Sequence, residues 1–261
     1  IMTKFICISG CTASGKSGLA EDLAAYLGNT VIINADALQV YKCWRILTDR
    51  PKEGSFNNLK LYGHVSCKTG YNVAHWLTEI KYLVEKFINT YETFIFVGGT
   101  GLYFNSLLNG LSQIPEIDLD IREQSIKHSN SCDFFIKELE KRDPEILKVI
   151  DNNNVRRLQR AWEVITQTGK SLNYWQNKPA HPIISNNETT KILLNPRKEE
   201  LIKKIKKRVE RMIARGVIDE VSSVHSKTWN TNLPFSKALG AKEIISYLNN
   251  EYNLDQMEIY D

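Results

Sequence analysis

The first hundred residues alternate between short apolar runs and amphipathic stretches. Three runs have the length and unbroken apolar character of strands buried on both faces of a sheet: residues 4–9, 30–36 and 93–101. Between the first two, leucines recur at helical spacing over residues 16–28, and the stretch ends in glycine, as helices often do. This order predicts an α/β fold with a doubly wound parallel sheet, whose ligands bind beyond the carboxyl ends of the strands.

From about residue 111 the pattern changes to helical runs broken by proline and glycine, with no convincing strand before residue 191. A strand is then predicted over 191–195, followed by an amphipathic helix over 197–216. The sequence therefore predicts an α/β core, residues 1–113 and 189–261, interrupted by a helical insertion, residues 114–188.

Composition adds little beyond a local charge. The chain has 261 residues, 42% of them hydrophobic, and a net charge of +4. Residues 197–215 hold nine Lys or Arg and three Glu, a net of +6, so the basic character belongs to that helix. Such a helix suits an RNA backbone, although a solvated charged face is the commoner role.

The cysteines and the length of the apolar runs predict the cellular compartment. The five cysteines are scattered without C-x-x-C spacing, which is typical of reduced thiols. No apolar run approaches the ~18 residues of a membrane-spanning helix. We expect a cytoplasmic protein that does not cross a membrane.

The segment "GCTASGKS" joins the first predicted strand to the first predicted helix. It matches the loop that binds phosphate oxygens with backbone N–H groups and a lysine. The hydroxyl of Ser17 is a candidate ligand for Mg²⁺. The predicted diphosphate-binding residues are Gly10, Thr12, Ala13, Ser14, Gly15, Lys16 and Ser17. The loop predicts a diphosphate site but does not by itself predict ATP.

The roles of one aspartate and of a pair of glycines stay open. Asp36, at the end of the second strand, can be a general base, a partner of Mg²⁺ or a helix cap, and the cap is the commoner role for such a residue. Gly98 and Gly99 can admit a ligand close to the backbone or simply form a tight turn.

Taken together, several segments resemble the tRNA dimethylallyltransferase (tRNA isopentenyltransferase) family, which has a P-loop NTPase-like fold. They lie in the family's order along nearly the whole chain: "GCTASGKS", "INADALQVY", "VGGTGLYF", "DNNNVRRLQRAWEVITQTGKS", "RVERMIARGVIDEV" and "LPFSKALGAKEI". The phosphate loop alone is unspecific, but its combination with the aspartate and "VGGTGLY" is specific.

The resemblance implies transfer of a dimethylallyl group from dimethylallyl diphosphate to N6 of the adenosine 3′-adjacent to the anticodon. The diphosphate is released, with Mg²⁺ as the cofactor and a monomer as the expected active form. Asp36 is the implied general base, Arg208 the arginine at the diphosphate, and Thr100 a further catalytic position.

The resemblance also implies a tRNA-binding surface, with the helical insertion clasping the anticodon stem-loop. The implied tRNA-binding residues are Asp36, Ala37, Leu38, Gln39, Thr100, Arg122, Gln159, Arg160, Ala161, Trp162, Glu163, Lys237 and Lys242.

The sequence departs from the family's pattern in several places. Ala37 replaces a serine, "LTDRP" (47–51) replaces "GTAKP", Gly63 replaces the first of paired histidines, and Ala241 replaces a tyrosine. The given sequence ends at Asp261, where the family continues into a basic segment that grips tRNA, so weaker tRNA binding is expected. Two alternatives stay open: a tRNA-binding remnant without turnover, and a small-molecule kinase.

Overall fold

The structure is a computed structural model that describes residues 3–51 and 58–251. The chain forms two compact units. The first comprises Ile1–Asn109 and Pro182–Asp261, and the second comprises Gly110–His181.

A five-stranded sheet forms the centre of the first unit. Its strands are β1 (Lys4–Gly10), β2 (Thr30–Asn34), β3 (Leu59–Lys60), β4 (Thr93–Gly98) and β5 (Thr189–Leu194). The spatial order is β3-β2-β4-β1-β5, and every neighbouring pair is parallel. The doubly wound parallel sheet predicted from the apolar runs is therefore confirmed.

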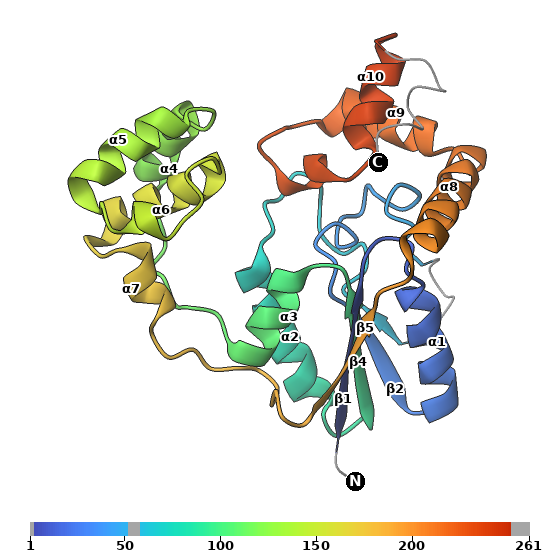
Figure 1. Cartoon of the computed structure of the whole chain (residues 1–261). Coiled ribbons are helices and arrows are strands. Elements are labelled where there is room, and N and C mark those ends of the chain that lie inside the picture. The colour runs from blue at the N-terminus through green and yellow to red at the C-terminus, as the bar shows by residue number, and fades with distance from the viewer. Residues whose placement is uncertain (1–2, 52–57, 252–261) are drawn as a thin grey trace. The chain divides into compact units, whose positions relative to one another are not determined.

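Helices cover both faces of this sheet (Figure 1). They are α1 (Lys16–Leu27) on one face and α2 (Val73–Phe87) and α3 (Gly101–Asn109) on the other. Successive strand residues point to opposite faces, so Ile32 packs with the buried alanines of α1, while Ile33 packs with Trp76 of α2. Burial on both faces explains why these strands are apolar throughout.

A helical layer lies beyond the carboxyl ends of the strands (Figure 1). It comprises α8 (Lys198–Ala214), α9 (Val217–Thr228), the 3₁₀ turn η2 (Pro234–Lys237) and α10 (Ala241–Leu248). Trp44, from the segment after β2, is fully buried there, and its indole N–H donates to the carbonyl of Phe235 at 2.8 Å. This layer closes one side of the edge where ligands of such sheets bind.

A disulfide joins Cys43 to Cys67 in the segments that connect β2 to α2. The expectation of free thiols is wrong for this pair, because the fold brings together two cysteines that lie 24 residues apart. Cys7, Cys11 and Cys132 are free.

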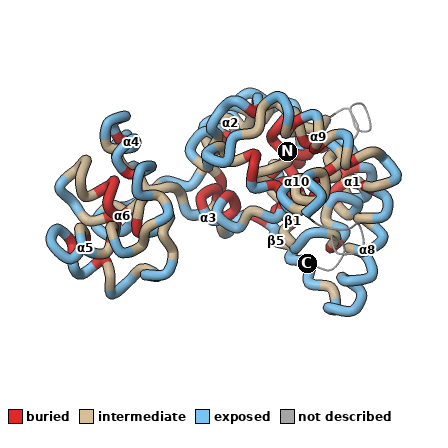
Figure 2. Tube along the Cα trace, turned by 90° about the horizontal axis from the view of Figure 1, so that it is seen from above, coloured by how far each residue is buried: buried red, intermediate tan, exposed pale blue. Residues whose placement is uncertain are grey.

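The second unit is built from helices with their own buried interior, seen clearly along α6 (Figure 2). They are α4 (Leu119–Lys127), α5 (Cys132–Arg142), the 3₁₀ turn η1 (Ile146–Lys148), α6 (Val155–Thr168) and α7 (Leu172–Gln176). Asn154 caps the start of α6 through its side-chain oxygen, and Gly169, at φ 64°, ends it. Phe135, Leu139 and Leu158 are fully buried between α5 and α6.

The unit boundaries differ from the predicted insertion of residues 114–188. Residues 182–188 belong to the first unit, where the N–H of Ile183 donates to the carbonyl of Leu107 at 3.1 Å and Ile184 is buried. None of the helices that the structure describes could span a membrane.

Candidate active site

The phosphate loop connects β1 to α1 as the sequence predicts. Gly15 precedes α1 at φ 95° and Ala13 stands at φ 61°, both in the left-handed region. The ammonium of Lys16 donates to the carbonyl of Cys11 at 3.0 Å across the loop. The unpaired N–H groups of the first turn of α1 and this lysine give the loop the donors that bind phosphate.

Asp36 lies just beyond the end of β2 and is held by its neighbours. Its backbone N–H donates to the side-chain oxygen of Asn34 at 2.9 Å, and its carbonyl accepts from the Asn34 amide at 2.9 Å. Its Oδ1 accepts from the N–H groups of Leu38 at 2.9 Å and Gln39 at 3.4 Å. No helix begins at Asp36, so Oδ1 stabilises the turn 37–40 and does not act as the helix cap that the sequence allowed, while the role of general base stays a prediction.

Thr100 and Gly98, at the end of the neighbouring strand β4, contact the backbone on either side of Asp36. The hydroxyl of Thr100 accepts from the N–H of Ala37 at 3.0 Å. A Cβ on Gly98 would overlap the carbonyl group of Ala35, so only glycine fits there. The close approach at Gly98 is between two stretches of backbone, which favours the tight-turn interpretation of that glycine.

Two cations, Lys16 and Arg208, both interact with Asp36. Burial lowers the pKa of Lys16, with Asp36 opposing this effect and Arg208 adding to it. Burial also lowers the pKa of Arg208, opposed by Asp49 and Asp36. Because both cations are partly desolvated, an anionic ligand at this position would stabilise their charged forms.

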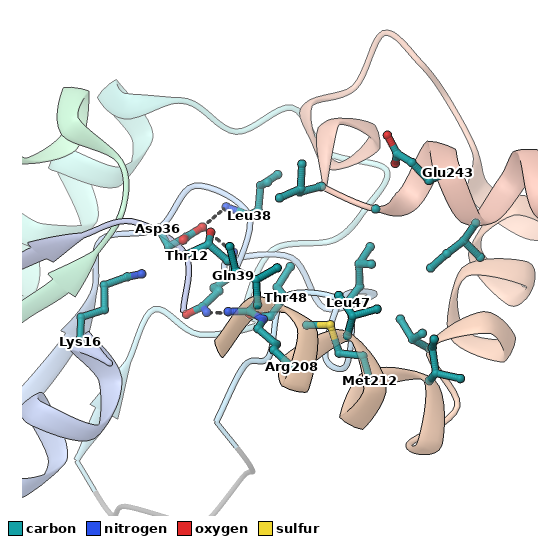
Figure 3. Close-up of a pocket in the computed structure, with 17 residues that line it drawn as sticks. Thr12, Lys16, Asp36, Leu38, Gln39, Leu47, Thr48, Arg208, Met212 and Glu243 are labelled. Atoms are coloured by element: carbon teal, nitrogen blue, oxygen red, sulfur yellow. Dashed lines mark hydrogen bonds between the residues drawn. The ribbon is translucent and has the colours of Figure 1, made fainter. Parts of the chain in front are cut away.

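Two cavities meet at these cations. One, of about 790 Å³, lies over the phosphate loop and is lined by Ala13, Gly15, Lys16, Ser17, Gly18, Gln39, Asp49, Lys204, Lys207, Arg208, Glu210 and Arg211. The other, of about 170 Å³, has largely apolar walls. Lys16, Gln39 and Arg208 line both. Figure 3 shows Lys16 and Asp36 at one end of the apolar cavity and Met212 and Glu243 toward the other.

Helix α8 serves both cavities. The apolar stripe predicted for this helix lines the small cavity through Ile205, Val209, Met212 and Ile213. Its cations Lys204, Lys207, Arg208 and Arg211 line the polar cavity at i, i+3, i+4 and i+7 spacing, which puts them on one face. Part of the local positive charge noted in the sequence therefore faces the phosphate loop.

The residues implied in tRNA binding fall into two groups. Ala37, Leu38, Gln39 and Thr100 surround Asp36 in the first unit, and the exposed Lys237 and Lys242 belong to η2 and α10 of that unit. Arg122, Gln159, Arg160, Ala161, Trp162 and Glu163 belong to the second unit. The structure therefore does not define one surface for all of them.

Three of the side chains implied in tRNA binding are buried. Ala161 and Trp162 are 0% and 3% exposed within the core of the second unit. Glu163 is 6% exposed and accepts a hydrogen bond from the hydroxyl of Ser125 at 2.7 Å. These side chains pack inside the second unit, and tRNA contact through them stays a prediction that their burial does not support.

The loop can also hold a metal ion together with its ligand. Among the residues that the structure describes, no three His, Cys, Asp or Glu side chains converge as a metal site. Mg²⁺ does not require such a cluster, because it usually keeps water and phosphate oxygens as ligands and takes one or two from the protein. The hydroxyl of Ser17 is exposed in the polar cavity beside Lys16, which fits this mode of binding.

Glu220 of α9 is a site residue that sequence reasoning missed. Its Oε1 accepts from the N–H groups of Arg45 and Ile46, each at 2.9 Å, and its Oε2 accepts from Ile46 at 3.1 Å and Leu47 at 2.9 Å. It thereby fixes the loop that carries Leu47 and Thr48 into the apolar cavity. Beside Asp219 at the start of a helix, Glu220 looked like an ordinary acidic residue in the first turn.

Replacing Glu220 by glutamine should lower the free energy of unfolding by about 2 kcal/mol, because an amide nitrogen cannot accept from the loop. Urea titration of the variant measures this loss. Asp219→Asn, a change at the neighbouring exposed carboxylate of the same helix turn, is the matched control and should shift stability by less than about 0.5 kcal/mol. Equal losses in both variants would contradict the role assigned to Glu220.

The comparisons with known proteins agree with this geometry. The model of the IPP transferase family matches residues 39–259. The chain belongs to the IPP transferase family. A protein of Cereibacter sphaeroides named tRNA dimethylallyltransferase is 38% identical over 255 residues, covering 96% of this chain and 84% of that relative. One of the same name from Wolbachia sp. subsp. Drosophila simulans is 40% identical, covering 96% and 85%.

Solved structures of IPP transferases are also similar to the chain. A eukaryotic dimethylallyltransferase acting on tRNA has a TM-score of 0.80 at 25% identity, covering 98% of this chain and 65% of that one. The tRNA isopentenylpyrophosphate transferase of Bacillus halodurans has a TM-score of 0.65 at 27% identity, covering 98% and 80%.

Two positions at which the sequence departs from the expected family pattern, Arg50 and Gly63, lie against each other. Gly63 stands at φ 56° and a Cβ there would overlap the guanidinium of Arg50. Arg50 thus occupies the space beside position 63, where the family's pattern has a histidine. A side chain at position 63 would therefore require the Arg50 side chain to move.

Proposed function

We propose that this chain transfers a dimethylallyl group from dimethylallyl diphosphate to N6 of the adenosine 3′-adjacent to the anticodon of tRNA. The observation that carries this proposal is the meeting of a polar and an apolar cavity at Lys16 and Arg208, with Asp36 lining the apolar one. A ligand with an anionic head and a short apolar chain fits such a pair of cavities, and an allylic diphosphate is such a ligand.

In this proposal the diphosphate lies on the phosphate loop, against Lys16, Arg208 and the N-terminus of α1. The five-carbon chain extends toward the apolar walls from α8, such as Val209 and Met212. Mg²⁺, when bound through Ser17 and the phosphate oxygens, would neutralise part of the diphosphate charge.

The chemistry requires proton removal and a stabilised leaving group. The exocyclic amine of adenine is a poor nucleophile, because its lone pair is delocalised into the ring. As N6 forms a bond to C1 of the prenyl group, the C1–O bond breaks and its electron pair leaves with the diphosphate. Asp36 Oδ2 accepts the proton that N6 loses. Lys16 and Arg208 stabilise the charge that develops on the departing diphosphate.

The adenosine must leave its stack to reach Asp36, as base-modifying enzymes require. Residues around the site (Ala37, Leu38, Gln39 and Thr100) would then contact the extruded base and its neighbours. Lys237 and Lys242 of the first unit, and Arg122, Gln159 and Arg160 of the second, would contact the RNA around it. We propose that a monomer in the cytoplasm performs this reaction.

Incubation with radiolabelled dimethylallyl diphosphate, Mg²⁺ and an anticodon stem-loop tests the function. Label should enter an RNA with adenosine at the target position and should not enter a matched RNA with inosine there, which lacks the N6 amine. RNA binding without any label transfer would contradict the proposal and favour the tRNA-binding remnant. Binding of ATP in calorimetry, without affinity for the prenyl donor, would favour the kinase.

A further inference from the structure

Asp49 lies between Arg208 of α8 and Arg215, the residue that directly follows this helix. Its Oδ1 is 3.0 Å from Nη1 of Arg215, and its Oδ2 is 4.0 Å from Nε of Arg208. The Arg208 side chain is 19% exposed, whereas those of Asp49 and Arg215 are 38% and 37% exposed. One carboxylate is therefore shared between a largely buried arginine of the site and a more exposed arginine outside it.

The backbone around Asp49 is built to hold this position. Asp49 stands at φ 50°, in the left-handed region that costs a non-glycine residue energy, and its N–H donates to the carbonyl of Ile46 at 3.0 Å. Ile46 is one of the residues that Glu220 anchors to α9. The loop therefore carries the carboxylate into the polar cavity, which Asp49 lines together with Lys16 and Arg208.

We infer that Asp49 is the counter-ion of Arg208 in the empty site, and that diphosphate takes Arg208 from it while Arg215 retains Asp49. This inference rests on the proposed function, because it takes diphosphate to be the anion that the site binds and releases. Asp49 is a positioning residue in this scheme, since it acts on the diphosphate through Arg208.

Because Asp49 is shared between two arginines, Arg208 can exchange Asp49 for diphosphate, and diphosphate for Asp49, at little cost. A buried arginine without a partner is costly, so Asp49 stabilises Arg208 before the anion arrives. When Arg208 turns to the diphosphate, Asp49 keeps the closer ion pair with Arg215 and is not left alone. Because the ion pair between Asp49 and Arg208 can form again, it competes with the diphosphate for Arg208 and favours release of that product.

Titration of the full chain with inorganic diphosphate and Mg²⁺ in a calorimeter tests this inference. Asp49→Asn, which keeps the shape and removes the charge, should bind diphosphate about tenfold more tightly. Arg215→Gln should bind it about threefold more weakly, because Asp49 then pairs with Arg208 alone. Glu210→Gln removes another carboxylate that lines the same cavity and should change the dissociation constant by less than about twofold.

Coupling between the residues separates this role from general electrostatics. In an Arg208→Ala background, Asp49→Asn should change diphosphate affinity by less than about twofold, because the residue through which it acts is absent. In an Asp49→Asn background, Arg215→Gln should lose most of its effect for the same reason. A tenfold gain that persists without Arg208, or an equal gain in Glu210→Gln, would overturn the inference, as would unchanged or weaker binding by Asp49→Asn.

Two controls keep the test decisive. Thermal unfolding of each variant verifies folding, and if Asp49→Asn does not fold, Arg215→Gln still tests the inference through its opposite sign. The titration contains neither prenyl donor nor RNA. If the variants show the expected changes in diphosphate affinity but no label is transferred, the result counts against the proposed function alone. If label is transferred normally but the diphosphate affinities do not change, the result counts against the role of Asp49 alone.

Discussion

Replacing Asp36 by asparagine is expected to slow prenyl transfer to N6 by a factor of about 10² to 10⁴, the usual contribution of a general base. Asparagine keeps an oxygen that can accept from the N–H groups of Leu38 and Gln39, as Asp36 Oδ1 does at 2.9 and 3.4 Å. The turn should therefore persist while the proton acceptor is lost. Affinity for dimethylallyl diphosphate should change by less than about threefold, because the phosphate loop is intact.

Single-turnover kinetics with saturating donor measures this effect without interference from product release. Glu243→Gln is the matched control, because Glu243 is another carboxylate lining the apolar cavity and lies toward the end away from Lys16 (Figure 3). Its transfer rate should stay within about threefold of the parent rate. An Asp36→Asn variant that retains full single-turnover rate would show that the proton leaves by another route.

The sheet could be predicted because the apolar residues of each main strand are enough to identify it as a strand. Strands β2 and β4 are buried along their whole length and β1 at its centre, so their residues are mainly apolar regardless of the partner strand. Strand β3 has only two residues, Leu59 and Lys60, and its existence depends on the register with β2. Nothing local distinguishes such a strand from a loop.

The same distinction explains the site. Gly10–Ser17 could be predicted because a phosphate loop needs specific residues at adjacent positions, and Asp36 could be singled out because it directly follows an apolar strand. The contacts of Glu220 with the loop 45–47 and of Asp49 with Arg208 join residues more than 150 positions apart. A carboxylate in the first turn of a helix has the same local pattern whether it faces solvent or accepts three N–H groups. The role of such residues appears only once the chain is folded.

Replacing Lys16 by alanine should produce the opposite pattern to Asp36→Asn. The lysine supplies a charge-assisted hydrogen bond of about 1.5 to 3 kcal/mol, so its loss should weaken binding of dimethylallyl diphosphate by a factor of about 10 to 150. Equilibrium titration of the donor measures this loss. Lys16→Arg should not restore affinity, because the loop holds a compact ammonium 3.0 Å from the Cys11 carbonyl and a planar guanidinium cannot take that place.

The matched control for Lys16→Ala is Lys204→Ala, which removes an exposed ammonium lining the same polar cavity from α8. Because solvent screens Lys204, its loss should weaken the donor by less than about threefold. If the cavity acted only through its summed positive charge, the two alanine variants would lose equal affinity. If Asp36→Asn also lost donor affinity as strongly as Lys16→Ala, one residue could no longer be assigned to the proton and the other to the diphosphate. The paired measurements thus separate binding of the leaving group from activation of the nucleophile.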